Sequence, residues 1–116
     1  MNTYKWSYVE ATQYSEPVVI DGQSFPKFVW LVLFAIDVSD GKNEPLDYRN
    51  QWNFPIPADP PKDYTPNPTP DQLVSWVQGD LMPDGVTTVQ TYMEGLADAA
   101  LANQLNPPSI VYTPPT

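Results

Sequence analysis

The sequence predicts an α+β fold, with a small antiparallel sheet of three or four strands followed by a proline-rich linker and a two-helix C-terminal part. Aromatic and β-branched residues with strand-type patterning fill the first 54 positions, and helix-type spacing begins after position 69. Seven prolines lie between Pro55 and Pro70, and four more between Pro107 and Pro115. We therefore expect a single domain at 1–106, with strands at about 4–54, a linker at 55–68, helices at about 70–81 and 87–105, and a proline-rich arm at 107–116.

Three segments carry the strand prediction. Tyr4, Trp6 and Tyr8 occupy alternate positions, which is typical of a strand with one buried face. Residues 17–20 form a short extended piece before the turn dipeptide Asp21-Gly22. Residues 28–36 are apolar at both parities, which predicts a central strand covered on both sides.

A polar connection at 37–44, with its turn at 39–41, leads into a last strand that ends at Pro55. This strand is expected to be half-buried and antiparallel to the central one, because alternate positions are apolar: Leu46, Tyr48, Trp52 and Phe54.

The first helix is predicted from its start signal. Thr69 and Gln72 have the spacing of a capping box, and Pro70 suits the first helical position. Its expected apolar stripe is Leu73, Trp76, Val77 and Leu81. Residues 83–85 should end this helix.

The second helix is expected to begin with a capping box formed by Thr87 and Gln90. Asn106, which precedes two prolines, is a natural stop. The stripe expected to face the sheet consists of Val89, Tyr92, Met93, Leu96, Ala100 and Leu105.

Composition argues against several function classes. The formal net charge is −9, and all five Lys and Arg residues lie within the first 62 positions, so direct nucleic-acid binding is not expected. The start lacks the apolar region of a signal peptide, and the longest apolar run, 28–36, is far shorter than the roughly 20 residues of a membrane helix. We expect a soluble protein that does not contact a membrane and is not secreted by a signal peptide.

Catalysis is not expected, because the chain has no His and no Cys and its carboxylates form no recognisable motif. Residues 37–44 superficially resemble a calcium loop. They lack the ligand spacing and the closing Glu of an EF-hand, and Lys42 sits among the would-be ligands, so a plain turn is favoured. We therefore assign no catalytic, cofactor-binding or metal-binding residue, and no cofactor.

Four tryptophans raise the alternative of a carbohydrate-binding module, because exposed indole rings can stack on sugars. Each lies at an apolar position of a predicted strand or helix: Trp6, Trp30, Trp52 and Trp76. Core packing is the favoured interpretation for such positions, and sugar binding is kept as a weaker alternative.

The C-terminal arm is the candidate partner-contact segment. A polyproline-II segment is already extended, so docking it costs less chain entropy than ordering a flexible tail. Tyr112, beside two aliphatic residues, could anchor in a pocket or add a strand to a neighbour's sheet, whereas a frayed terminus is the alternative. The candidate contact residues are Pro107, Pro108, Ile110, Val111, Tyr112, Pro114 and Pro115.

Several short motifs follow one another along most of the chain. They are Tyr4-Lys5-Trp6, the aromatic strand at 28–36 with Asp40-Gly41, the helix start at 69–77, and Asn-Pro-Pro at 106–108 with a final Pro-Pro pair. This order resembles a small, poorly characterised family of tailed-bacteriophage proteins of the cyanophage and marine-phage type. That family is similar in its aromatic β-meander, a T-x-D-Q-x-x-x-W-V helix and an N-P-P…P-P tail.

The resemblance implies phage origin, synthesis in the host cytoplasm and no catalytic residue. We expect a virion structural accessory protein, such as a capsid decoration, head–tail or tail component, that contacts other phage structural proteins or further copies of itself as a homo-oligomer. The alternative is an acidic phage inhibitor of a host nucleic-acid enzyme. That role needs carboxylates clustered on one face, and the acidic residues after position 70 are well separated along the helices.

Overall fold

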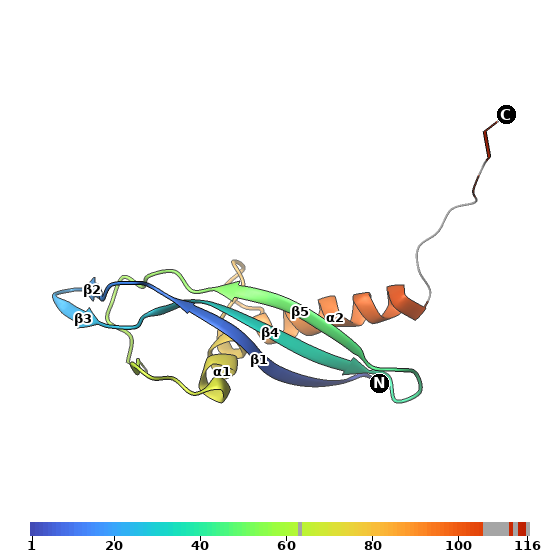
Figure 1. Cartoon of the computed structure of the whole chain (residues 1–116), viewed down its shortest axis with the longest axis horizontal. Coiled ribbons are helices and arrows are strands. Elements are labelled where there is room, and N and C mark those ends of the chain that lie inside the picture. Colours follow the sequence, from blue (N-terminus) through green and yellow to red (C-terminus); the bar gives the residue numbers. More distant parts are fainter. Residues whose placement is uncertain (63, 106–111, 113, 116) are drawn as a thin grey trace.

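The computed structural model describes residues 1–62, 64–105, 112 and 114–115. A three-stranded antiparallel sheet has the order β1 (Thr3–Gln13), β4 (Val29–Ser39), β5 (Leu46–Asn53), and a separate hairpin pairs β2 (Val18–Ile20) with β3 (Gln23–Phe25). Two helices follow, α1 (Pro70–Gly79) and α2 (Val89–Leu105). Figure 1 shows the hairpin at one end of the molecule and α2 running towards the other. The predicted α+β class is confirmed.

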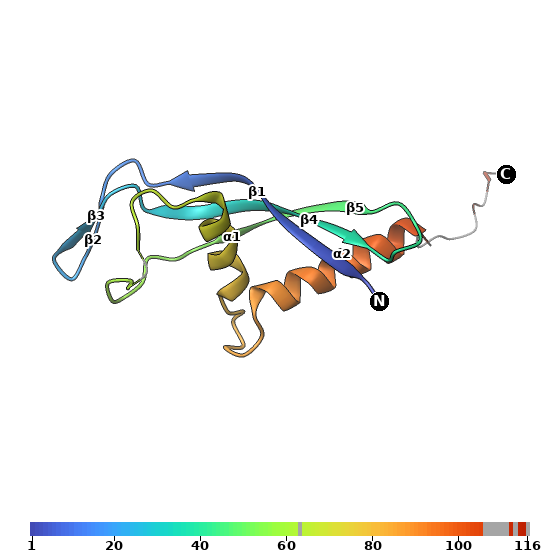
Figure 2. The ribbon, with the colours of Figure 1, turned by 90° about the horizontal axis from the view of Figure 1, so that it is seen from below.

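Strand β4 forms the centre of the sheet, as its composition predicts. Alternate residues of β4, from Val32 through Phe34 and Ile36 to Val38, are fully buried and form the middle of the main core. Both helices lie against this one face of the sheet (Figure 2). The expected cover on both sides of β4 is found only in part, because on the other face Ala35 is buried, Leu31 and Leu33 are half-buried and Asp37 is exposed.

Strand β1 is longer than expected and irregular. Its register with β4 shifts between Tyr8 and Glu10, which places Val9 in a bulge. Tyr8 is therefore partly exposed at the sheet edge, and the predicted burial of every second aromatic residue holds for Tyr4 and Trp6 only. Strand β5 alternates between half-buried and exposed residues throughout, as predicted.

The small hairpin β2–β3 is closed by a two-residue turn that requires residues able to adopt positive φ values. Asp21 and Gly22 have φ values of 51° and 79°, the left-handed conformations that a two-residue hairpin turn requires. Strand β2 and its turn were predicted, whereas the three-residue β3 was not. The hairpin encloses a second, smaller core formed by Val18, Ile20, Phe25 and Phe28.

Helix α1 begins as the sequence predicts. The Thr69 side chain accepts a hydrogen bond from the Gln72 amide, and the Gln72 side chain accepts one from the Thr69 amide. The helix ends at Gly79, two residues earlier than expected, because Asp80 is already extended. Leu81 consequently lies outside the helix with 47% of its surface exposed, and Val74 takes a buried position instead.

The start of α2 differs from the predicted capping box. The Asp84 carboxylate accepts hydrogen bonds from the amides of Val86 and Thr87 and so holds Thr87 in the preceding turn. Thr88 caps the helix in its place, with its hydroxyl oxygen accepting from the Thr91 amide. The capping residue is therefore one position later than expected.

The buried stripe of α2 also differs in part. Tyr92 and Leu105 are exposed, whereas the buried residues recur every fourth position: Val89, Met93, Ala97 and Leu101. These residues form a single i, i+4 row of the helix, and the small side chain of Ala97 permits a close approach to the sheet.

Candidate functional site

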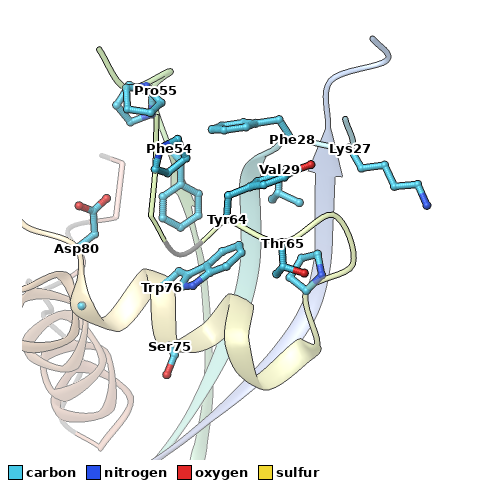
Figure 3. A pocket seen from close by; sticks show the side chains of 14 residues that line it. Lys27, Phe28, Val29, Phe54, Pro55, Tyr64, Thr65, Ser75, Trp76 and Asp80 are labelled. Atoms are coloured by element: carbon cyan, nitrogen blue, oxygen red, sulfur yellow. The ribbon is translucent and has the colours of Figure 1, made fainter. Parts of the chain in front are cut away.

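A mainly apolar hollow lies between the hairpin end, the proline-rich linker and α1. It has a volume of about 570 Å³. Its walls are built mainly from two residue types (Figure 3). The aromatic walls are Phe28, Phe54, Tyr64 and Trp76, and the proline walls are Pro55, Pro57, Pro61 and Pro68. We call this hollow the proline–aromatic pocket.

Tyr64 holds the linker in place as one wall of the pocket. Its ring meets Phe25 edge-on at 4.9 Å between centroids and stacks on Phe28 at 6.3 Å. Its hydroxyl donates a hydrogen bond to the carbonyl oxygen of Pro26. Burial raises the pKa of the Tyr64 hydroxyl, which keeps it a donor. The linker therefore folds back on the hairpin rather than crossing solvent.

Polar groups lie at the two ends of the pocket. In Figure 3, Lys27 extends from one end and Asp80 stands at the other. Lys27 has a φ of 57°, a conformation that non-glycine residues rarely adopt, and its Nζ donates to the side-chain oxygen of Asn67 at 3.3 Å. Asp80 Oδ2 accepts a hydrogen bond from Trp52 Nε1 at 2.7 Å. Between these two ends the lining consists mainly of aromatic and proline rings, with Thr65 and Ser75 among the remaining residues.

This lining favours binding over reaction chemistry. Aromatic and proline rings offer flat apolar surfaces, and such grooves suit extended, proline-rich or aliphatic segments. The two charged groups at the ends are already engaged with Asn67 and Trp52. The arrangement can therefore hold an apolar chain segment through ring stacking and exclusion of water.

A second hollow, of about 910 Å³, lies between β1 and the two helices and has a mixed lining. Polar side chains from both helices, including Gln78 and Gln90, make up much of its wall. Tyr4 and Trp6 also border it, and their polar atoms are already bonded to helix carboxylates. This hollow offers less apolar surface for a partner than the proline–aromatic pocket does.

Three carboxylates fasten the helical layer to the sheet. Asp98 accepts from the Tyr4 hydroxyl at 2.8 Å, Glu94 accepts from Trp6 Nε1 at 3.0 Å, and Asp80 accepts from Trp52 Nε1. Burial, reinforced by the hydrogen bond to Asp98, raises the pKa of Tyr4 to about 12. These acidic residues therefore have structural partners, which the sequence did not indicate.

The segment that resembled a calcium loop is a turn whose carboxylate is used internally. Asp40 accepts hydrogen bonds from the amides of Lys42 and Asn43 and from the Asn43 side chain. The Asn43 amide, followed by the other two donors, lowers the pKa of Asp40 to about 2. Within the described residues, no group of three or more His, Cys, Asp or Glu side chains is arranged to hold a metal ion.

The tryptophans are packed rather than displayed. Trp6 stacks on the buried Phe34 with centroids 4.8 Å apart, and Trp52 and Trp76 pack against the main core. Trp30 is half-buried and lies 6.2 Å from Tyr14. Trp76 alone lines the proline–aromatic pocket, so the four rings do not form one platform.

The predicted partner-contact residues are placed only in part. Tyr112 is 73% exposed, and Pro114 and Pro115 are exposed. Pro107, Pro108, Ile110 and Val111 lie outside the described residues. Sequence reasoning missed the pocket because it treated residues 55–68 as a connection. The available signal was an aromatic residue, Tyr64, within a run of prolines.

Comparison of the chain with protein-family models, with curated proteins and with solved structures finds no match. Among the described residues, no helix has both the length and the apolar character needed to cross a membrane.

Proposed function

We propose that this protein is an accessory component of a bacteriophage virion, without catalytic activity, that acts by holding an apolar segment of a structural partner or of another copy. The observation that carries the proposal is the proline–aromatic pocket of about 570 Å³. Its four aromatic and four proline walls match an extended apolar chain better than a polar small molecule. The resemblance of the sequence to a tailed-phage family supports the virion setting.

The distribution of acidic groups favours this role over inhibition of a nucleic-acid enzyme. A mimic of nucleic acid needs free carboxylates on one face. Glu94 and Asp98 point instead at aromatic donors of the sheet, and Asp84 is bonded to its own turn. Asp80 accepts from Trp52 Nε1, so four of the five acidic residues after position 70 are committed to the fold.

The packing of the tryptophans weighs against a carbohydrate-binding module. A sugar platform needs exposed ring faces, and Trp6 gives one face to Phe34. Trp6 and Trp76 border different hollows, so neither hollow offers two indole rings to a sugar.

Quantitative mass spectrometry of purified virions of the encoding phage tests the proposal. We expect the chain at a fixed stoichiometry relative to the capsid or tail proteins, surviving purification through a density gradient. Absence from purified particles, together with abundance in the infected-cell lysate, would overturn the virion assignment.

A further inference from the structure

We infer that the proline–aromatic pocket of one copy binds the C-terminal arm, residues 107–116, of a second copy, so that copies join head to tail. This inference rests on the proposed function and names the occupant of the pocket. It commits to one partner, a second copy of this chain, and to one anchor, the side chain of Tyr112.

The chemistry of the arm matches that of the pocket. Residues 106–116 contain two proline pairs, two aliphatic residues and one tyrosine, and no charged residue. Prolines favour the extended polyproline-II form, which aromatic-lined grooves bind at low entropic cost. Tyr112 is 73% exposed, which is a large apolar ring left in water. The pocket supplies the ring faces that would cover it.

The distribution of charge along the chain also favours the arm as the contacting segment. The chain has a formal net charge of −9, so two copies repel each other at long range. All acidic residues lie at or before Asp98, and the arm carries none. An uncharged arm is the part of the chain that can approach a second acidic copy with the smallest electrostatic cost.

The geometry of α2 keeps the arm away from its own pocket. Helix α2 begins beside the pocket, where the Val89 amide donates to the carbonyl oxygen of Asp80 at 2.8 Å. It then runs away from the hairpin end (Figure 1). Asp98 bonds to Tyr4, which is opposite Val38 on the neighbouring strand. Nine strand steps of about 3.4 Å separate Val38 from Val29 in the pocket wall, a distance of roughly 30 Å.

The arm is too short to cover that distance. Six residues separate Leu105, the last residue of α2, from Tyr112, and the seven Cα–Cα steps of a fully extended chain span at most about 25 Å. Leu105 is further along α2 than Asp98, so it is further from the Val29 wall, whereas the Asp80 wall lies about one helix length, roughly 24 Å, from Leu105. Tyr112 therefore cannot reach the Phe28–Val29 end of its own pocket, and that end is open to the arm of another copy.

An arm at one end and a pocket at the other make a heterologous interface. Such a contact repeats until a ring closes or a filament forms. Each copy would offer one arm and one pocket, which suits a component present in several copies around a symmetric particle.

Association of the full chain gives the first test. Sedimentation velocity over a wide concentration range should show species larger than a monomer. Tyr112→Ala should weaken association at least tenfold, because it removes a buried aromatic anchor. The matched control is Tyr92→Ala, which removes an exposed tyrosine from α2 and should leave association unchanged. A full chain that stays monomeric at every concentration would overturn the inference.

The pocket is tested with a matched pair of glycines. An added Cβ meets nothing within 4 Å at Gly79, which lines the pocket, or at Gly95, which does not. Gly79→Glu places a charge against apolar walls and should abolish association, whereas Gly95→Glu makes the same charge change and should preserve it. Circular dichroism checks that both variants fold. Equal association of the two variants would contradict docking in the pocket.

Mixing the two defective variants gives a sharper result. Tyr112→Ala has an intact pocket, and Gly79→Glu has an intact arm. Each alone should be monomeric, and their mixture should form a heterodimer that does not grow, because only one arm–pocket contact is available. A mixture that stays monomeric would rule out transfer of the arm between copies.

Peptides separate failure of this inference from failure of the proposed function. A peptide of residues 106–116 and an oligoproline of equal length are added to the Tyr112→Ala chain, and the indole signal of Trp76 is followed by NMR. Movement with the arm peptide supports the inference. Movement with oligoproline alone overturns it and leaves the pocket as a docking site for another partner. If neither peptide moves the Trp76 signal, the pocket does not bind an extended apolar segment, and the proposed function is contradicted.

Discussion

The sheet-and-helix body and the hairpin end of this molecule are held together by different means. The body, formed by β1, β4, β5 and the two helices, encloses ten buried residues and has aromatic-to-carboxylate hydrogen bonds between its layers. The hairpin end encloses four buried residues and depends on Tyr64, which arrives from the linker almost 40 positions after β3. The pocket therefore lies at the hairpin end, which has fewer buried apolar residues than the body.

This placement fits a general property of binding sites. Segments with few buried apolar contacts open at low free-energy cost, and binding surfaces are drawn from them. A pocket walled by the linker can adapt to an occupant while the body stays unchanged. The comparison therefore predicts that changes in the body act on global unfolding, whereas changes at the hairpin end act locally.

The largest effect is expected from truncating the centre of the body. Phe34 is fully buried and stacks on Trp6, so Phe34→Ala should lower the free energy of unfolding by about 3–5 kcal/mol. Phe25→Ala, its counterpart in the small core, should cost less in global unfolding and should mainly speed amide exchange in β2 and β3. Urea unfolding monitored by circular dichroism, with hydrogen exchange, measures both. Equal losses of global stability would show that the two regions unfold as one unit.

A smaller loss of stability is expected when a hydrogen bond between the sheet and the helices of the body is removed. Asp98→Ala leaves the Tyr4 hydroxyl and the Asn2 amide without their acceptor. We expect a loss of roughly 1–2 kcal/mol, because a hydrogen bond to a charged group is partly offset here by exposure to solvent. Asp59→Ala, an exposed carboxylate of the linker, is the control and should change little. Urea unfolding that gives the same midpoint for both variants would contradict a structural role for Asp98.

The body was largely predictable from the sequence because its signals are local. Strand alternation in β5 and the capping box at Thr69 each depend on residues within a few positions, and both are confirmed. The central place of β4 follows from its unbroken apolar run. The predicted cap of α2 was wrong by one residue, because two neighbouring threonines could both cap the helix. The bond from the Thr87 amide to Asp84 keeps Thr87 in the turn, and Thr88 caps the helix.

The pocket was not predictable, because its parts are distant in sequence. Phe28, Tyr64 and Trp76 meet only after the linker has folded back, and no periodicity reports such a contact. The same limit applies to the bonds of Glu94 and Asp98, which accept from residues about 90 positions earlier. The sequence pattern predicted solvent-exposed carboxylates at these positions, whereas in the structure both accept hydrogen bonds from aromatic side chains.

A stabilising change of modest size is expected at the hairpin end. Lys27 has a φ of 57°, and glycine adopts this conformation without the steric cost that a Cβ imposes. Lys27→Gly should therefore raise the free energy of unfolding by about 0.5–1 kcal/mol. The control is Lys42→Gly, where φ is not positive and glycine should lower stability. Urea unfolding of both variants decides, and destabilisation by Lys27→Gly would show that the bond to Asn67 outweighs the strain.

The smallest effect appears in the alkaline titration of two tyrosines, one from each region. Burial and the Asp98 bond raise the pKa of Tyr4 to about 12, whereas burial is what raises that of Tyr64. A raised tyrosine pKa means that the folded state favours the neutral phenol. The stabilisation from Tyr4 is thus complete below about pH 10 and is lost as the pH rises towards 12. Phenolate absorbance, with Tyr4→Phe and Tyr64→Phe to assign the steps, should show that Asp98→Asn lowers the pKa of Tyr4 and leaves that of Tyr64 unchanged. A shift of both tyrosines would mean that the body and the hairpin end are electrostatically coupled.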